Sequence, residues 1–209
     1  TGNIDPDSVR SKITSKTKAI MAVHWGGEPC DMDELQAIAD QYKLTLIEDA
    51  AHALGAIYKN RPIGTLSDFT AFSFQAIKHL TTGDGGALCC KDEKDYYRAK
   101  ALCWFGIDRA NSKPTILGER EYDITRVGYK YHMNDLAAAV GLGNLAEFES
   151  HLQRRRQNAD FYRNELKNVK GLTLLEAKSD RQSACWLFTI LVEQRISFIK
   201  KLKKEEIPT

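Results

Sequence analysis

Residues 69–86 read FTAFSFQAIKHLTTGDGG, an apolar run that leads through a short polar turn to Lys78 and then to three glycines. The run has the length and composition of a strand, and the glycines predict a turn. A lysine held in such a turn becomes a nucleophile when desolvation or nearby positive charge lowers its pKa, and lysine amines act covalently chiefly by forming Schiff bases with carbonyls. The alternative is a solvated surface lysine beside a strand end, which is where most lysines lie. The choice depends on which residues surround it.

The composition is that of an ordinary globular protein, with 209 residues, 43% hydrophobic and 28% charged. This length suits one domain, or one large domain with part of a second. The formal charge of +2 is too small for a general nucleic-acid-binding surface, and no apolar run reaches the length of a transmembrane helix. We therefore predict neither nucleic acid nor a membrane as a partner.

The cysteines number five, form no CxxC pair and lie mostly inside apolar segments. This usage is typical of reduced thiols and predicts a cytoplasmic protein. No metal-ligand motif accompanies them, so no metal site is predicted.

Residues 19–49 have the pattern of a strand, a helix and a second strand. Apolar runs of strand length occur at residues 19–25 and 44–47, and apolar residues recur at helical spacing in residues 31–42, where Asp31 can cap the helix. Such a unit forms parallel strands with a right-handed crossover. Its second strand runs directly into Asp49.

Open parallel sheets bind ligands beyond the carboxyl ends of their strands, so the segment EDAAHALGA at residues 48–56 lies where a site is expected. Taken alone, Asp49 is as well explained as the cap of the next turn, and His52 as a surface imidazole. The strand at residues 69–74 ends near Ser73 and Lys78. A carboxylate at one strand end therefore stands near a hydroxyl and an amine at another.

The remaining chain carries weaker patterns. Residues 108–121 are polar and predict a loop, whose Arg109 is expected to be solvated. Further predicted elements are a short buried strand at 86–90, helices at 7–16, 91–104 and from 134 onward, a solvated face at 154–156, strands at 172–175 and 186–192, and a last helix capped by Ser197.

Three segments carry a resemblance to a known family: DAAH (49–52), SFQAIK (73–78) and TTGDGG (81–86). They resemble the pyridoxal-phosphate-dependent nucleotide-sugar aminotransferases of the DegT/DnrJ type. Further similar segments occur in the family's order, so that the resemblance covers nearly the whole chain. These are NIDP (3–6), HWGGEPCDMDEL (24–35), WFGIDR (104–109), GYKYHMNDLAAAVGL (128–142) and RRR (154–156).

The resemblance implies the aspartate-aminotransferase fold (fold type I). This is an α/β fold with a mostly parallel central sheet, flanking helices and a smaller C-terminal α/β domain. It predicts that residues 1–145 form the large cofactor-binding domain, without its N-terminal part. Residues 146–209 are then the connecting helix and the beginning of the small domain.

The resemblance also implies roles around the ring of pyridoxal 5′-phosphate. The cofactor works as an electron sink only when its ring nitrogen is protonated, so a carboxylate must face it, and Asp49 has that role. Ala51 is small enough to lie against the ring face. His52 is expected to hydrogen-bond the ring's 3-hydroxyl.

Four further residues are assigned to the phosphate and the aldehyde by the same resemblance. Ser73 is expected to bind the phosphate, with Gln75 as a weaker candidate. Lys78 is expected to hold the cofactor as a Schiff base and, once freed, to act as the catalytic base. Lys130 stands where the family commonly has an asparagine that reaches the partner subunit's cofactor, and a lysine can still meet a phosphate as a point charge.

The implied activity is transfer of an amino group from an amino acid, with L-glutamate expected, to a keto-sugar nucleotide. Pyridoxamine phosphate is the intermediate form of the cofactor. The resemblance places this activity in amino-sugar biosynthesis for surface polysaccharide or natural products, in a homodimer or higher even oligomer. The alternatives are a sugar dehydratase of the same family, in which histidine replaces the lysine, and a non-catalytic regulatory or truncated relative. The presence of Lys78, with His79 only as its neighbour, favours amino transfer.

Overall fold

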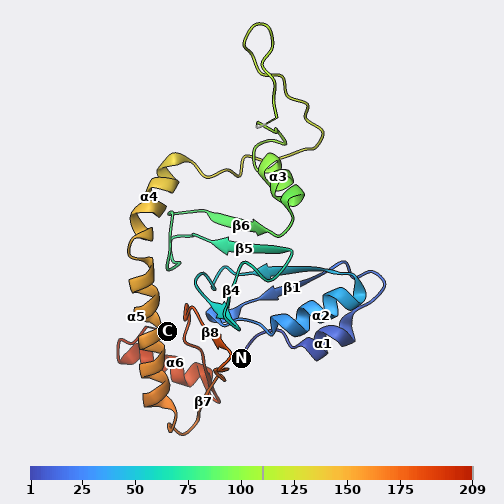
Figure 1. Ribbon diagram of the computed structural model, residues 1–209. Helices are drawn as coiled ribbons and strands as arrows, with labels where there is room; N and C mark the ends of the chain where they lie inside the picture. The colour runs from blue at the N-terminus through green and yellow to red at the C-terminus, as the bar shows by residue number, and fades with distance from the viewer. Residues whose placement is uncertain (110, 209) are drawn as a thin grey trace.

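The central feature of the computed structural model, which describes residues 1–109 and 111–208, is a four-stranded sheet in the order β1-β2-β5-β6 (Figure 1). β1 and β2 run parallel, as do β2 and β5, whereas β6 runs antiparallel to β5. The predicted α/β class with a mostly parallel central sheet is therefore confirmed.

The helices and strands follow one another along the chain with these bounds: α1 Pro6–Lys12, β1 Ala19–Val23, the 3₁₀ helix η1 Trp25–Gly27, α2 Met32–Tyr42, β2 Thr45–Asp49, β3 Ile57–Tyr58, β4 Arg61–Pro62, β5 Phe69–Ser73, β6 Gly86–Cys90, α3 Glu93–Leu102, α4 Asp135–Leu145, α5 Phe148–Leu166, β7 Leu172–Leu174, β8 Arg181–Gln182, β9 Ile190–Val192 and α6 Arg195–Lys204.

The unit β1–α2–β2 forms because α2 presents one apolar stripe to the sheet. Met32, Leu35, Ile38 and Ala39 on that stripe are buried, while the opposite side of the helix is polar. The parallel register pairs Val23 with Asp49, so both strands end at the same edge. The strand–helix–strand prediction is confirmed, and it delivers Asp49 to that edge.

Asp31 does not cap α2 in the way we predicted. It occupies the N-cap position, but its side chain makes no capping hydrogen bond. The carboxylate instead pairs with Lys178 at 2.8 Å and Arg181 at 2.7 Å. Both partners of these pairs are ionised, whereas the N–H of a capping bond is neutral, so the cations of the returning chain take the carboxylate.

Four other local predictions are wrong. Strand β6 is exposed at residues 86–88 because it lies at the edge of the sheet. Trp104 lies beyond the end of α3, Trp186 lies in a bend ahead of β9 rather than in a strand, and Ser197 lies inside α6, whose N-cap is Gln194. Strand β6 thus keeps its predicted bounds and differs only in burial, whereas the other three residues lie outside the element or capping position that the local pattern predicted.

Residues beyond 145 pack against the first part of the chain. Strand β8 extends a small sheet with β3 and β4, and the buried core of the large sheet includes Phe148, Leu152 and Ala184. Arg156, predicted to be solvated, donates to the carbonyls of Ser183 and Gly55, both at 2.9 Å. The division into domains at residue 145 stays a prediction.

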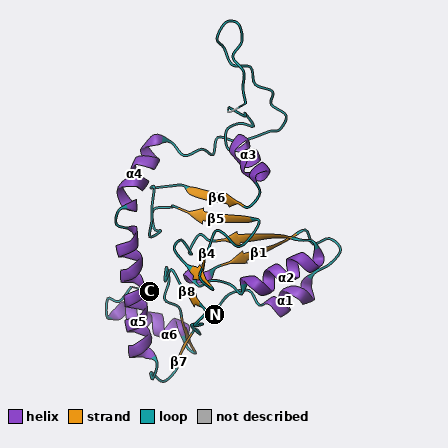
Figure 2. Ribbon diagram, in the orientation of Figure 1, coloured by secondary structure: helices purple, strands orange, loops and turns teal. Residues whose placement is uncertain are grey.

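Two regions lie outside this packed body. The segment between α3 and α4 projects as a long arm, and α4 continues almost directly into α5 along one side of the sheet (Figure 2). Most of α4 is exposed although its sequence is largely apolar, with Leu136 82% and Leu142 71% exposed. Among the described residues, no helix combines the length and apolarity that a membrane crossing requires.

Candidate functional site

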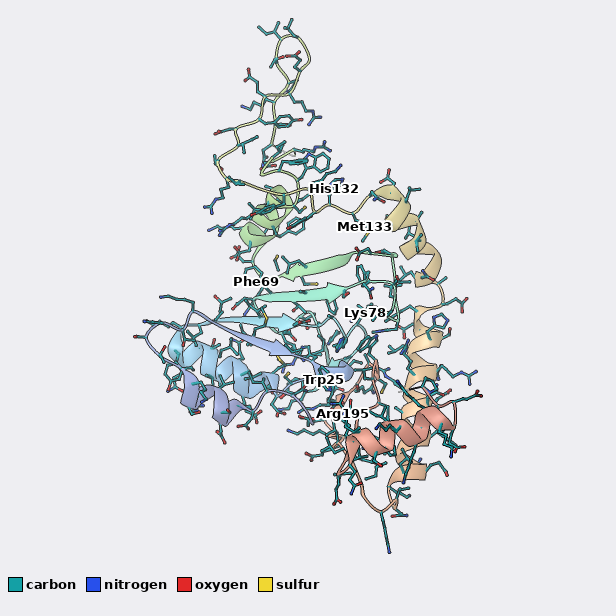
Figure 3. All side chains as sticks on the ribbon, turned by 180° about the vertical axis from the view of Figure 1, so that it is seen from behind. Trp25, Phe69, Lys78, His132, Met133 and Arg195 are labelled. Carbon is teal, nitrogen blue, oxygen red and sulfur yellow. The ribbon has the colours of Figure 1, made fainter. Side chains whose placement is uncertain are left out.

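The candidate site lies where β2 and β5 end. Asp49, the last residue of β2, pairs in register with Ala71 of β5, and β5 ends two residues later at Ser73. The chain then turns through residues 74–78, and Lys78 lies between the sheet and the α4–α5 side of the molecule (Figure 3). The predicted meeting of a carboxylate, a hydroxyl and an amine at neighbouring strand ends is what the topology produces.

The Asp49 carboxylate is held by the turn that follows it. Its Oδ1 accepts a hydrogen bond from the Ala51 N–H at 3.0 Å, and its main-chain carbonyl accepts one from the His24 N–H at 3.1 Å. Asp49 therefore does cap the next turn, which the sequence analysis gave as the alternative to a binding role. Because this uses one carboxylate oxygen, the other is left for a ligand.

Lys78 and His52 both contact one aromatic side chain, Trp186. The His52 and Trp186 rings are stacked with centroids 3.9 Å apart at an angle of 16°, and the Lys78 Nζ lies 4.0 Å from the Trp186 ring centroid. The Gly26 N–H donates to His52 Nδ1 at 3.3 Å, which makes Nδ1 an acceptor and places the hydrogen of the neutral ring on Nε2. His52 therefore has an Nε2–H donor that the bond to Gly26 does not use.

The surroundings of the site lower the pKa of both the Lys78 amine and the His52 imidazole. Burial lowers the pKa of Lys78, and attraction to Asp49 opposes this only in part. The pKa of His52 is also lowered, first by burial and then by repulsion from Lys78. A lower pKa makes the amine of a lysine more readily available as a nucleophile and base, which is the direction that the sequence interpretation of Lys78 requires.

The turn between Ser73 and Lys78 is organised by hydrogen bonds of its own side chains. The Gln75 N–H donates to Ser73 Oγ at 3.3 Å, and the Ile77 N–H donates to Gln75 Oε1 at 3.2 Å. The Lys78 N–H closes the turn on the Gln75 carbonyl at 2.9 Å. Gln75 therefore has a clear role in the turn, while the Ser73 hydroxyl keeps its own hydrogen for a ligand.

The glycine tract allows β6 to start directly beside this turn. A Cβ on Gly86 would lie 2.5 Å from the Phe72 carbonyl oxygen, and Gly85 has a φ of +157°. The Phe74 N–H donates to the Gly85 carbonyl at 2.8 Å, which brings the two segments together. Glycine is needed here because the backbones approach too closely for a side chain.

Glu48 lies fully buried beneath the site and was not singled out by sequence reasoning. Its carboxylate accepts hydrogen bonds from Ser67 at 2.7 Å, Thr70 at 2.9 Å and His24 Nε2 at 2.8 Å. The Cys30 N–H donates to His24 Nδ1 at 3.0 Å, so Nε2 carries the imidazole hydrogen. These bonds join the ends of β1 and β2 to the beginning of β5 and thereby hold the backbone of Asp49 in place.

Two candidates from the arm lie elsewhere in the chain. Lys130 forms an isolated bridge with Trp104, and the Arg109 guanidinium, predicted to be solvated, lies 4.2 Å from the Trp104 ring centroid. His132, two residues after Lys130, is well separated from Lys78 in Figure 3. The structure thus brings Asp49, His52, Ser73 and Lys78 to one edge but does not bring Lys130 to the same site within this chain.

Trp186 is the site residue that sequence reasoning missed. It lies 108 positions after Lys78 in an apolar run that resembles a strand, and no spacing connects the two. Only the path of the chain after β8 brings it to the site. A tryptophan beside a cysteine with a positive φ, Cys185 at 50°, is a sign of a bend, but that angle is known only from the structure.

The chain is similar to several known proteins in sequence and in structure. The chain is 37% identical over 194 residues to the spore coat polysaccharide biosynthesis protein SpsC of Bacillus subtilis, covering 92% of this chain and 50% of that protein. It is 35% identical over 192 residues to the GDP-perosamine synthase of Escherichia coli O157:H7, covering 91% of this chain and 50% of that protein. The crystal structure of the sugar aminotransferase CalS13 from Micromonospora echinospora superposes with a TM-score of 0.91 at 36% identity, covering 98% of this chain and 56% of that one.

The chain thus spans about half the length of the curated relatives that it matches. The model of the DegT/DnrJ/EryC1/StrS aminotransferase family matches residues 1–209 of the chain, all the residues given. The chain therefore belongs to the DegT/DnrJ/EryC1/StrS aminotransferase family, as the resemblance of its motifs predicted.

Proposed function

We propose that this chain carries the lysine site of an aminotransferase that moves an amino group from an amino acid to a nucleotide-linked keto-sugar. Aminotransferases of this family depend on pyridoxal phosphate, which supplies an electron sink for the donor's Cα when it is bound. The observation that carries the proposal is the convergence of Lys78, Asp49 and His52 at the edge where β2 and β5 end.

The residues at this edge fit the ring of that cofactor. Asp49 has one carboxylate oxygen bound to the Ala51 N–H and a second available for a protonated ring nitrogen. The half-buried Ala51 offers a methyl group small enough to lie against a flat ring. His52 has its Nδ1 occupied by the Gly26 N–H, so its Nε2–H is available to a ring oxygen such as the 3-hydroxyl.

The phosphate would be held by the turn after β5. Ser73 accepts from the Gln75 N–H and retains its own hydroxyl hydrogen for a phosphate oxygen. Gln75 uses its side-chain oxygen within the turn, so only its NH₂ group is left to bind phosphate. Lys130, whose main chain pairs with Trp104 after the end of α3, would reach the phosphate from a second subunit.

Lys78 would act first as a tether and then as a base. Burial, which lowers the pKa of Lys78, would favour use of its Nζ as the nucleophile that holds the cofactor's aldehyde carbon, with the aldehyde oxygen leaving as water. After the donor's amine takes its place, the freed Nζ would be in reach to accept the proton from the donor's Cα and to donate it again. The Lys78 side chain could thus serve as tether and as base, because its Nζ would remain within the site after the covalent link is broken.

The acceptor is proposed to be a keto-sugar joined to a nucleotide, and the donor L-glutamate. Two relatives support the sugar: one is named for the biosynthesis of a spore coat polysaccharide and another as a GDP-perosamine synthase. The product would then enter amino-sugar biosynthesis for a surface polysaccharide or a natural product. A panel of keto-sugar nucleotides, assayed with glutamate for release of 2-oxoglutarate, identifies the acceptor.

Reductive trapping tests the proposal directly. The full-length protein is incubated with pyridoxal phosphate, reduced with borohydride and mapped by peptide mass spectrometry. We expect the pyridoxyl group on Lys78, and a Lys78→Arg variant, which keeps the charge but cannot form the link, should carry none at that position. A pyridoxyl group on Lys59, Lys91 or Lys130 instead would show that the assignment of Lys78 is wrong.

A further inference from the structure

Trp186 is the point where the chain after β8 meets the candidate site. The Ala184 N–H donates to the Gly27 carbonyl at 3.0 Å, and the Leu187 N–H donates to the Gly26 carbonyl at 3.1 Å. A Cβ on Gly27 would come within 2.8 Å of the His52 carbonyl oxygen, so only glycine permits this approach. Main-chain bonds on both sides therefore set the position of Trp186.

The indole of Trp186 contacts three groups of the site. It stacks on the His52 ring at 3.9 Å and lies 4.0 Å from the Lys78 Nζ. Its Nε1–H donates to the carbonyl of Ile77, the residue before Lys78, at 3.3 Å. The same side chain thus holds both the backbone and the amine of the Lys78 turn.

This contact matters for the direction of the amine. Lysine has a flexible four-carbon stem, and within the described part of the chain the structure shows no ion pair that would hold the Lys78 ammonium. An ammonium above an aromatic ring is attracted by the negative face of the ring. The indole therefore supplies the contact that restricts where a free Lys78 amine points.

We propose that Trp186 is a positioning residue that holds the free Lys78 amine and the His52 ring in the orientation that the lysine site uses. The proposal rests on the proposed function, since the direction of the amine matters only if Lys78 reacts. It makes the segment at residues 183–187 a part of the site, although that segment lies far from Lys78 in the sequence.

The first test measures the reactivity of Lys78 in full-length protein freed of cofactor. A limiting amine-reactive reagent is applied across alkaline pH, and labelling at Lys78 is followed by peptide mass spectrometry. Loss of the ring in Trp186→Leu removes the stabilisation of the ammonium, so the midpoint should move to lower pH and labelling below it should rise by about twofold to thirtyfold. Trp186→Phe keeps an aromatic face and should stay close to the wild type.

The histidines near Lys78 do not titrate in the pH range in which the labelling of Lys78 is measured. Burial lowers the pKa of both His52 and His79, so neither imidazole changes its charge across this alkaline range. Trp25→Leu is the matched control, because Trp25 lies edge-to-face with His52 at a centroid distance of 5.9 Å, whereas the described cation–π contact of Lys78 is with Trp186. An unchanged midpoint in Trp186→Leu, with only a higher plateau from better access, would overturn the proposal.

The second test does not need the leucine variant to fold. In protein labelled with 5-fluorotryptophan, the ¹⁹F resonance of Trp186 is the one that disappears in Trp186→Phe. It should shift with pH at the same midpoint as the labelling of Lys78, and Lys78→Met should abolish that shift. A resonance that does not respond to Lys78 would show that the amine and the indole are apart.

The outcomes separate this proposal from the proposed function. Both tests use protein without cofactor, whereas the reductive trapping of Lys78 uses the cofactor. Coupling between Trp186 and Lys78 without a pyridoxyl group on Lys78 would leave the contact standing and refute the proposed function. Trapping on Lys78 with no effect of Trp186 would refute the positioning role alone.

Discussion

At the scale of single residues, Asp49 shows how one side chain serves the fold and the site together. Its Oδ1 accepts from the Ala51 N–H, so the carboxylate that is proposed to face the ring nitrogen also shapes the turn that carries Ala51 and His52. An asparagine retains an oxygen for the same backbone bond but has no charge. The substitution Asp49→Asn therefore separates the two roles.

We expect Asp49→Asn to bind pyridoxal phosphate measurably but to lose at least about a hundredfold in kcat, because the protonated ring nitrogen loses its counter-charge. Binding is measured by the absorbance of the bound cofactor, and turnover by release of the keto acid. Asp84→Asn, a neutralisation in the exposed glycine turn, is the control. Turnover of Asp49→Asn within a few fold of the wild type would remove Asp49 from this role.

At the scale of elements, the buried Glu48 holds three strands at one edge. Burial acts to raise its pKa, but the hydrogen bonds from His24, Ser67 and Thr70 outweigh this and lower it from its ordinary value of 4.5. A carboxyl group whose pKa is lowered by folding stabilises the native state above the unfolded value. That stabilisation is lost as the pH falls from about 4.5 through the folded pKa.

Glu48→Gln should lower the free energy of unfolding at pH 7 by about 1–3 kcal/mol, because an amide cannot accept from three donors at once. The difference from the wild type should narrow as the pH falls below about 4.5, where the wild-type carboxyl group becomes protonated in the unfolded chain. Urea unfolding at several pH values measures this. Glu34→Gln, on the exposed side of α2, is the control. If the free energy of unfolding of Glu48→Gln changed with pH as much as that of the wild type, the prediction would be contradicted.

At the scale of the whole molecule, the parts that project from the packed body expose apolar side chains, and we propose that these meet a second subunit. The arm exposes Ile116, Leu117 and Val127, and α4 exposes Leu136 and Leu142. Exposed apolar area on this scale is typical of an interface. Lys130 lies at the base of the arm, so the proposed dimer would bring it to a partner's phosphate through an isologous contact.

Subunit complementation tests this arrangement. Lys78→Ala and Lys130→Ala subunits, each inactive alone, are mixed under conditions that allow exchange. A mixed dimer contains one site with both lysines intact, so activity should recover to about a quarter of the wild-type value if subunits mix at random and sites act independently. The absence of recovery despite proven exchange would show that Lys130 acts within its own chain or holds the fold only.

Much of the site could be predicted because its parts lie close together in the sequence. The run from β5 through Lys78 to the glycines is local, and so is the step from β2 through Asp49 to His52. Periodicity and the rule for parallel strands were enough to place both at one edge. The sequence did not predict where β9 and α6 begin. Trp186 was placed in the strand but precedes it, and Ser197 was placed before the helix but lies inside it.

By itself, the sequence determined the α/β class, the crossover from β1 to β2 and the placement of a carboxylate and a lysine at neighbouring strand ends, because hydrophobic period and chain direction act over short distances. Only the tertiary structure decided that Asp31 pairs with Arg181, that Glu48 collects three donors and that Trp186 lies on Lys78. These contacts join residues far apart in the chain. They form because the returning segment buries charge and aromatic surface together, and no local pattern encodes that partner choice.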